Sequence, residues 1–171
     1  RTLARPATAA LLFLSKYNNT RSRVTRGEMT TINDLLRDKP RDIWNVSPDD
    51  SVYDALQLMA DKNIGAVLVM DDKHLVGLLS ERDYARKLIL ANRASRDTAV
   101  RDVMTTRVAY VAPSKEVEEC LALMTDKRFR HLPVMDEGRV VGLVSIGDLV
   151  KAIIEKKQFM IEQLESYISG Q

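Results

Sequence analysis

The sequence has few of the residues that bind metals or form disulfides. Its 171 residues include one cysteine, Cys120, and two histidines, so an internal disulfide and a usual zinc site are excluded. An apolar run at residues 7–14 is far shorter than the roughly 20 residues that a membrane-spanning helix needs. The sequence also lacks a nucleophile–histidine pair and a Walker-type phosphate loop. We therefore expect a protein that is not an enzyme and has no membrane partner.

Acidic residues are missing from the first 27 residues, which hold six basic ones. The net charge of +2 therefore hides a split, because the other 20 basic residues are outnumbered by 24 acidic residues, giving the remainder a net charge of −4. A mildly acidic folded part disfavours nucleic acid as a partner. We expect residues 1–29 to be an extension without function, while an organelle transit segment, whose arginine-rich composition they share, and a functional arm are the alternatives. We expect a cytoplasmic protein, or an organelle-matrix protein if residues 1–28 are a transit segment.

A repeat with a period of 65 residues organises the rest of the chain. The segment that begins at Val46 aligns without a gap with the segment that begins at Val111. Identical pairs include Pro48/Pro113, Val52/Val117, Leu56/Leu121, Met59/Met124, Val69/Val134, Asp71/Asp136, Gly77/Gly142, Ser80/Ser145 and Asp83/Asp148. Self-similarity at a fixed period indicates a duplicated structural unit.

Each copy predicts the order strand, helix, strand, strand, helix. Apolar residues at positions i, i+3, i+4 and i+7 predict an amphipathic helix in each copy. These residues are Val52, Ala55, Leu56 and Met59 in the first copy and Val117, Cys120, Leu121 and Met124 in the second. Short strands are predicted at 43–46, 66–70 and 75–79, and at 108–111, 132–135 and 140–144. One unit alone exposes a face of its strands, so two units are expected to bury those faces against each other.

Two residues of the second copy qualify this pattern. Gly138 lies in the predicted turn, where it adopts a positive φ without steric cost. Pro133 has no amide hydrogen for a strand ladder, so its strand is expected to be an edge or irregular there.

The last helix continues beyond the repeat. Its apolar residues are Leu149, Ile153, Ile154, Met160, Ile161, Leu164 and Ile168. The duplicated core is too short to cover all of them. A short leading helix with Ile32, Leu35 and Leu36, or a second subunit, would do so, and we expect a homodimer.

A glycine, a serine and an aspartate open the second helix of each copy. They are Gly77, Ser80 and Asp83 in the first copy, and Gly142, Ser145 and Asp148 in the second. Ser-x-x-Asp at a helix start is close to a capping box, which stabilises the helix. The same helix start also suits a phosphate, and a carboxylate there can accept hydrogen bonds from both hydroxyls of a ribose. The two interpretations are compatible.

The duplicated unit with its G-h-h-[ST]-x-x-D ending, where h is apolar, resembles a tandem pair of CBS domains, the Bateman module. The likeness spans roughly residues 31–154 and is closest to stand-alone CBS-pair proteins of bacteria and plant organelles. It implies an α/β (α+β) fold of two repeats related by a pseudo-two-fold axis. The expected divisions are an arm at 1–29, CBS domains at 30–92 and 108–171, and a linker at 93–107.

The resemblance implies a regulatory module that binds an adenosine-containing ligand: AMP, ADP, ATP or NAD(H), with S-adenosylmethionine less favoured. Carried over by position, Asp83 and Asp148 would bind ribose. Phosphate would be bound by Ser80, Ser145, Arg130, Arg82 and His131. Adenine would be lined by Gly65, Ala66, Val67, Leu132 and Pro133, and Tyr110 would stack on it or simply lie half-buried in its strand.

The two copies differ where the family often carries a basic residue, because the first has Gly65 and the second Arg130. This difference argues against equal occupancy of the two sites, unless Arg82, beside the first motif, supplies the missing charge. It also predicts that Asp148→Ala weakens binding more than Asp83→Ala, because Arg130 lies in the same half as Asp148. The module would transmit its ligand state to a separate, unidentified protein. The alternative is a purely structural dimer or adaptor in which the serine–aspartate pairs only cap helices.

Overall fold

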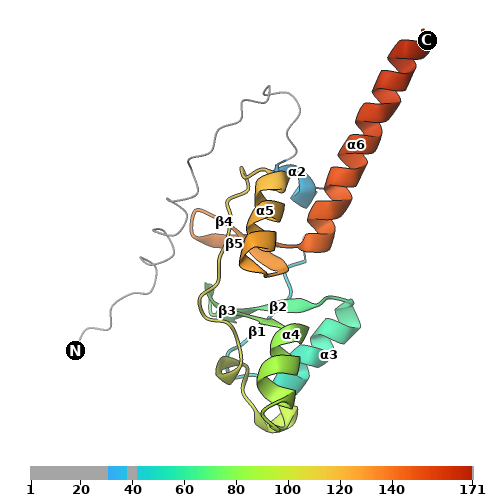
Figure 1. Ribbon diagram of the computed structural model, residues 1–171. Coiled ribbons are helices and arrows are strands. Elements are labelled where there is room, and N and C mark those ends of the chain that lie inside the picture. Colours follow the sequence, from blue (N-terminus) through green and yellow to red (C-terminus); the bar gives the residue numbers. More distant parts are fainter. Residues whose placement is uncertain (1–30, 38–41, 171) are drawn as a thin grey trace.

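The computed structural model describes residues 31–37 and 42–170. The expectations for residues 1–29 lie outside this part of the chain. Figure 1 shows two halves of similar composition, one above the other, with the last helix projecting away from them. Within the described residues, the mixed helices and sheets of the two halves confirm the predicted α+β class.

The first half follows the predicted order closely. It comprises β1 (Asn45–Val46), α3 (Val52–Lys62), β2 (Ala66–Asp71), β3 (His74–Ser80), α4 (Glu81–Asp83) and a π-helical turn, η2 (Tyr84–Ile89). Helix α3 begins where the Ser51 side chain accepts a hydrogen bond from the Asp54 amide (3.1 Å) and ends at Asn63, whose φ is 52°. Its residues Val52, Ala55 and Met59 are buried, as their spacing predicts.

The second half repeats these elements 65 residues later. It comprises α5 (Val117–Lys127), β4 (His131–Asp136), β5 (Arg139–Ser145) and α6 (Ile146–Ser169). Two 3₁₀ turns, η3 (Ser95–Asp97) and η4 (Val100–Asp102), lie in the connection between the halves, and the short helix α2 (Ile32–Arg37) precedes the first half.

The two hairpins have the same register. β2 pairs antiparallel with β3, and β4 with β5, and each pair contains one irregularity, between Val69 and Met70 and between Val134 and Met135. The turn of the second hairpin includes Gly138 at φ 78°, as expected for a glycine at this position. The repeat in the sequence is therefore also a repeat of the backbone.

The first strand of each copy is shorter than predicted, and Pro133 explains the difference between the two. In the first half, β1 pairs parallel with β2, and the Leu68 amide donates to the Trp44 carbonyl (3.3 Å). Pro133 occupies the equivalent position and has no amide hydrogen, so this bond cannot form in the second half. The predicted strand at 108–111 is reduced to a single parallel bridge between Val111 and Val134.

The segments that precede each copy pack on the opposite half. Ile32 of α2 is buried in the cluster of the second half, and its amide donates to the carbonyl of Lys115 (2.8 Å). Val100 of η4 is buried in the cluster of the first half, and its amide donates to the carbonyl of Asp50 (2.9 Å). The halves are thus linked by an exchange of leading segments.

Helix α6 is covered only near its start. Leu149 is fully buried, and Ile153 packs against the same cluster as Leu35 and Leu36 of α2, as the sequence suggested. The later apolar side chains are exposed: Phe159, Met160, Ile161, Leu164, Tyr167 and Ile168. None of the helices in the described ranges is both long enough and apolar enough to span a membrane.

Candidate functional site

A complete capping box opens the second helix of each half. The Asp83 Oδ2 atom accepts from the Ser80 amide (3.1 Å) and hydroxyl (2.6 Å), and the Asp83 amide donates back to the Ser80 hydroxyl (3.3 Å). The corresponding distances for Ser145 and Asp148 are 2.7, 2.8 and 3.2 Å. The sequence predicted this cap from the serine-to-aspartate spacing.

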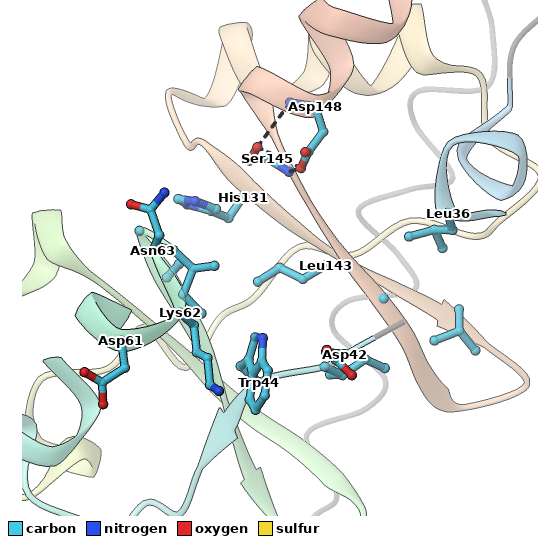
Figure 2. Close-up of a pocket in the computed structure, with 16 residues that line it drawn as sticks. Leu36, Asp42, Trp44, Asp61, Lys62, Asn63, His131, Leu143, Ser145 and Asp148 are labelled. Carbon is cyan, nitrogen blue, oxygen red and sulfur yellow. Dashed lines mark hydrogen bonds between the residues drawn. The ribbon is translucent and has the colours of Figure 1, made fainter. Parts of the chain in front are cut away.

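A cavity of about 610 Å³ lies between the two halves. Figure 2 shows Ser145 and Asp148 at one side of it, across from Asn63 and Trp44 of the first half. Its lining residues are Leu36, Asp42, Ile43, Trp44, Asp61, Lys62, Asn63, Ile64, Gly65, Ala66, His131, Val141, Gly142, Leu143, Ser145 and Asp148. The cavity therefore combines the capping box of the second copy with the start of β2 in the first.

The start of β2 and the start of β4 approach each other at this cavity. A Cβ atom placed on Gly65 would lie 3.7 Å from the imidazole of His131 and 3.5 Å from the carboxylate of Glu81. The ring of His131 lies beside the cavity, between Asn63 and the Ser145–Asp148 pair (Figure 2). Gly65 of the first half and His131 of the second thus lie within van der Waals reach of each other at the cavity.

Most residues of the cavity lining, among them Trp44, Lys62 and Leu36, were not anticipated from the sequence. The indole of Trp44 lines the cavity, and the ammonium nitrogen of Lys62 lies 4.1 Å from the centre of the ring. Leu36 reaches the cavity from α2, the leading segment that packs on the second half. A signal for Trp44 existed in its position directly before β1, but the contribution of Leu36 depends on a tertiary exchange that no local pattern encodes.

The capping box of the first half has different neighbours. The Lys87 ammonium lies 2.7 Å from Asp83 Oδ1 and also donates to the carbonyl of Val103 (2.9 Å) and the hydroxyl of Thr105 (3.2 Å). The Thr105 hydroxyl in turn donates to Asp83 Oδ1 (3.3 Å). Ala152 occupies the position equivalent to Lys87, so the Asp148 carboxylate has no lysine four residues after it.

Other predicted site residues lie outside the cavity lining. Arg130 is exposed, and the guanidinium of Arg82 donates to the backbone carbonyl of Arg128 (3.0 Å), which joins the two halves. Val67, Leu132, Pro133 and Tyr110 are also absent from the cavity lining. Val67 and Leu132 belong to the two buried hydrophobic clusters, Pro133 is buried in β4, and Tyr110 is half-buried.

No group of three or more metal-ligating side chains occurs among residues 31–37 and 42–170. Cys120 is buried within α5, and this burial raises the pKa of its thiol to about 12. The thiol therefore stays protonated at neutral pH, as expected for a core residue.

Comparison with known proteins identifies the family. The chain matches the family model of the CBS domain at residues 31–90 and 100–155. It is 36% identical over 178 residues to the CBS domain-containing protein CBSX3, mitochondrial, of Arabidopsis thaliana, an alignment that covers 96% of this chain and 86% of the relative.

Solved structures agree with this likeness. A protein with CBS domains from Burkholderia ambifaria is 52% identical, has a TM-score of 0.72 and covers 74% of this chain and 95% of its own. The CBS domain pair of protein MJ0100, in complex with 5′-methylthioadenosine and S-adenosyl-L-methionine, shares the fold at 23% identity with a TM-score of 0.67, covering 75% of this chain and 98% of its own. The chain belongs to the CBS-domain family and carries a pair of CBS domains.

Proposed function

We propose that this CBS pair is a regulatory module that binds an adenosine-containing ligand, AMP, ADP, ATP or NAD(H), in the cavity between its halves. The observation that carries the proposal is the position of the Ser145–Asp148 capping box at the wall of that cavity, facing the start of β2. The Asp148 carboxylate would accept hydrogen bonds from the ribose hydroxyls, and the Ser145 hydroxyl would contact phosphate.

The start of α6 gives one side of the cavity a place for a phosphate group. Ser145 is the N-cap of α6, a helix of 24 residues whose first amides attract anions. Lys62 and His131 line the same cavity and add a cation and a hydrogen-bonding imidazole, and the carboxylates of Asp42 and Asp61 line it as well. Trp44, Leu36 and Leu143 supply the apolar surface that a base requires. With Asp148, three carboxylates of the described residues line the cavity, so we place the phosphate at the N-terminus of α6, and the lining as a whole does not select against the positive sulfonium of S-adenosylmethionine, the ligand in the MJ0100 complex.

A ligand in this cavity would touch both halves and so favour one arrangement of them over another. A separate protein that distinguishes these arrangements would then respond to the ligand through a population shift. We propose a regulatory role of this kind, with no catalysis by the chain itself.

We further propose that the chain holds one nucleotide, at the Asp148 side. In the other half, the Lys87 ammonium and the Thr105 hydroxyl already engage the Asp83 carboxylate. A ribose would have to displace a cation at 2.7 Å to reach the same oxygen. Charge-assisted contacts of this kind contribute more than neutral hydrogen bonds, so the first site is disfavoured.

Isothermal titration with AMP, ADP, ATP, NAD, NADH and S-adenosylmethionine tests the proposal. We expect at least one phosphate-bearing ligand to bind with a Kd well below 1 mM, which corresponds to about −4 kcal/mol. Failure of all six ligands to bind at that concentration would contradict it.

The second candidate is a purely structural dimer or adaptor, favoured by the fact that both serine–aspartate pairs form complete capping boxes and so have a structural role as helix caps. It expects the melting temperature to be the same with and without each nucleotide. A nucleotide-dependent rise in melting temperature would rule out this alternative.

A further inference from the structure

The projecting half of α6 exposes a row of large apolar side chains. Ile161 is 48% exposed, Leu164 59% and Ile168 82%, and Figure 1 shows this end of the helix extending beyond both halves. An unsupported helical segment of about 12–15 residues is only marginally stable in water, because most helix stability in proteins comes from packing an apolar face. The row therefore requires a covering surface.

The spacing of the row is that of a two-helix seam. Val150, Ile154, Lys157, Ile161, Leu164 and Ile168 follow one another at alternating steps of four and three residues. This is the heptad spacing that keeps side chains on the seam between two paired helices. Five of the six positions are apolar, and Lys157 interrupts the row near its middle.

The beginning of the same helix offers a surface of matching character. A shallow groove is lined by Ile146, Gly147, Val150, Lys151, Ile154 and Glu155. Val150 is 40% exposed and Ile154 61% exposed, so the seam continues along the helix into this groove. A second α6 running in the opposite direction would place its exposed C-terminal residues here.

We propose that two copies of this chain associate through α6, with the two helices antiparallel and their two-fold axis near residue 159. In this register Val150 faces the partner's Ile168, Ile154 faces the partner's Leu164, and Lys157 faces the partner's Ile161. Every apolar position of the row is then covered. The long stem of Lys157 packs beside the partner's Ile161 while its ammonium reaches water.

Charge selects this orientation over the parallel one. In the antiparallel register Lys151 flanks the partner's Glu165, and the pair occurs twice by symmetry. Lys151 lies 3.7 Å from Glu155 of its own helix, an exposed contact that leaves it available for the partner. In a parallel pair in register, the two Lys157 side chains would face each other, and like charges at a seam are destabilising. The proposal is independent of nucleotide binding.

Light scattering after size-exclusion chromatography of the full chain and of two variants tests the surface. The wild type is expected to be a dimer, and Ile161→Asp is expected to lose the dimer because it puts a charge on the seam. Phe159→Asp is the matched control: Phe159 is 62% exposed on the side of α6 away from the seam, so this variant should stay dimeric. Circular dichroism checks that both variants keep their helix content. A monomeric wild type, or an Ile161→Asp variant that remains a dimer, overturns the proposal.

Cysteine cross-linking tests the direction of the helices. A mixture of Ile154→Cys and Leu164→Cys chains should form a disulfide-linked dimer under mild oxidation, because the antiparallel register pairs these positions. The Ile154→Cys chain alone should not cross-link, and the native Cys120 is buried and stays unreacted. Cross-linking of Ile154→Cys with itself, or no cross-link in the mixture, overturns the antiparallel register.

Discussion

At the scale of single residues, the two aspartates of the repeat show how one motif acquires two environments. Asp83 and Asp148 make the same capping box, yet only Asp83 is followed four residues later by a lysine. The capping boxes are readable from the sequence because serine, aspartate and helix start are contiguous. The Lys87 contact is also readable by alignment of the repeats, but its bond to Thr105 depends on the fold.

Replacement of Lys87 should change the binding stoichiometry. Lys87→Ala gives the first half the residue that the second half has at Ala152, and removes the ammonium from Asp83 Oδ1. We expect titration with the tightest nucleotide to shift from one ligand per chain towards two. Lys115→Ala is the control, because it removes an i,i+4 ion pair of 2.8 Å with Glu119, away from both capping boxes, and should leave the stoichiometry at one. A Lys87→Ala variant with unchanged or weaker binding would contradict this role of the lysine.

The thiol of Cys120 should be inert in the folded protein. Burial raises its pKa from 9.0 to about 12, so the thiolate that reacts with alkylating agents is scarce in the native state well above neutral pH. Because the pKa of the Cys120 thiol is higher in the folded than in the unfolded state, ionisation of this thiol leaves the free energy of unfolding unchanged below pH 9.0. The free energy of unfolding then falls progressively as the pH rises from 9.0 towards about 12. Iodoacetamide labelling followed by mass spectrometry should be slow in buffer and fast in urea. Equal labelling rates would show that the thiol is accessible.

At the scale of elements, the hairpins and amphipathic helices could be predicted from periodicity, whereas the predicted strand at 108–111 is reduced to a single bridge, which Pro133 explains once the pairing is known. The exchange of leading segments could not be predicted. Helix α2 has only six residues, and nothing in the apolar pattern of Ile32, Leu35 and Leu36 says which half they cover. Pairing choices of this kind are set by the tertiary fold, which is also why Leu36 was missed as a cavity residue.

Gly77 of β3 and Gly142 of β5 lie where the exchanged segments pack closely against these strands. A Cβ atom on Gly77 would overlap the side chain of Met104, and one on Gly142 would lie 2.6 Å from Leu36. Gly77→Ala should therefore destabilise the protein by about 1–3 kcal/mol, the usual cost of overpacking. Urea unfolding should show a smaller effect of Gly77→Ala in a Met104→Ala background, because the obstructing side chain is gone.

Gly147→Ala is the control for the Gly77→Ala measurements. Its added Cβ would meet only the Ser145 hydroxyl at 3.6 Å, an ordinary contact inside α6. Alanine is the better helix former by about 1 kcal/mol, so this variant should be at least as stable as the wild type. If Gly77→Ala lowers the free energy of unfolding by the same amount in the wild type and in the Met104→Ala background, the close contact between Gly77 and Met104 is refuted.

At the scale of the whole molecule, the duplicated fold could be predicted from the sequence, whereas the cavity required the structure. The sequence placed the capping boxes, but it could not show that the second box faces β2 of the other half while the first is occupied by Lys87 and Thr105. The net charge of +2 also gave no indication of the site, because the six basic residues at 1–27 mask the net charge of −4 of the remainder. Among the described residues, the cationic side chain that lines the cavity is that of Lys62.

A ligand that bridges the halves should stabilise the whole fold. At a concentration of about 100 times its Kd, a nucleotide that binds only the native state adds roughly 2.7 kcal/mol to the free energy of unfolding. Thermal unfolding followed by circular dichroism should therefore move to higher temperature with the binding nucleotide. The same nucleotide concentration should stabilise Asp148→Ala by only about 0.4–1.4 kcal/mol, because a 10- to 100-fold loss of affinity reduces the effect.

Titration calorimetry of the wild type, Asp148→Ala and Asp83→Ala tests most directly whether the Asp148 side of the cavity holds one adenine nucleotide. Asp148→Ala and Asp83→Ala remove the same capping interaction from opposite halves, so each controls for the stability lost by the other. We predict one ligand per wild-type chain, an affinity lowered about 10- to 100-fold in Asp148→Ala, since hydrogen bonds to a charged group contribute about 1.5–3 kcal/mol, and little change in Asp83→Ala. Two equivalent ligands per chain, or equal losses in the two variants, would contradict the account.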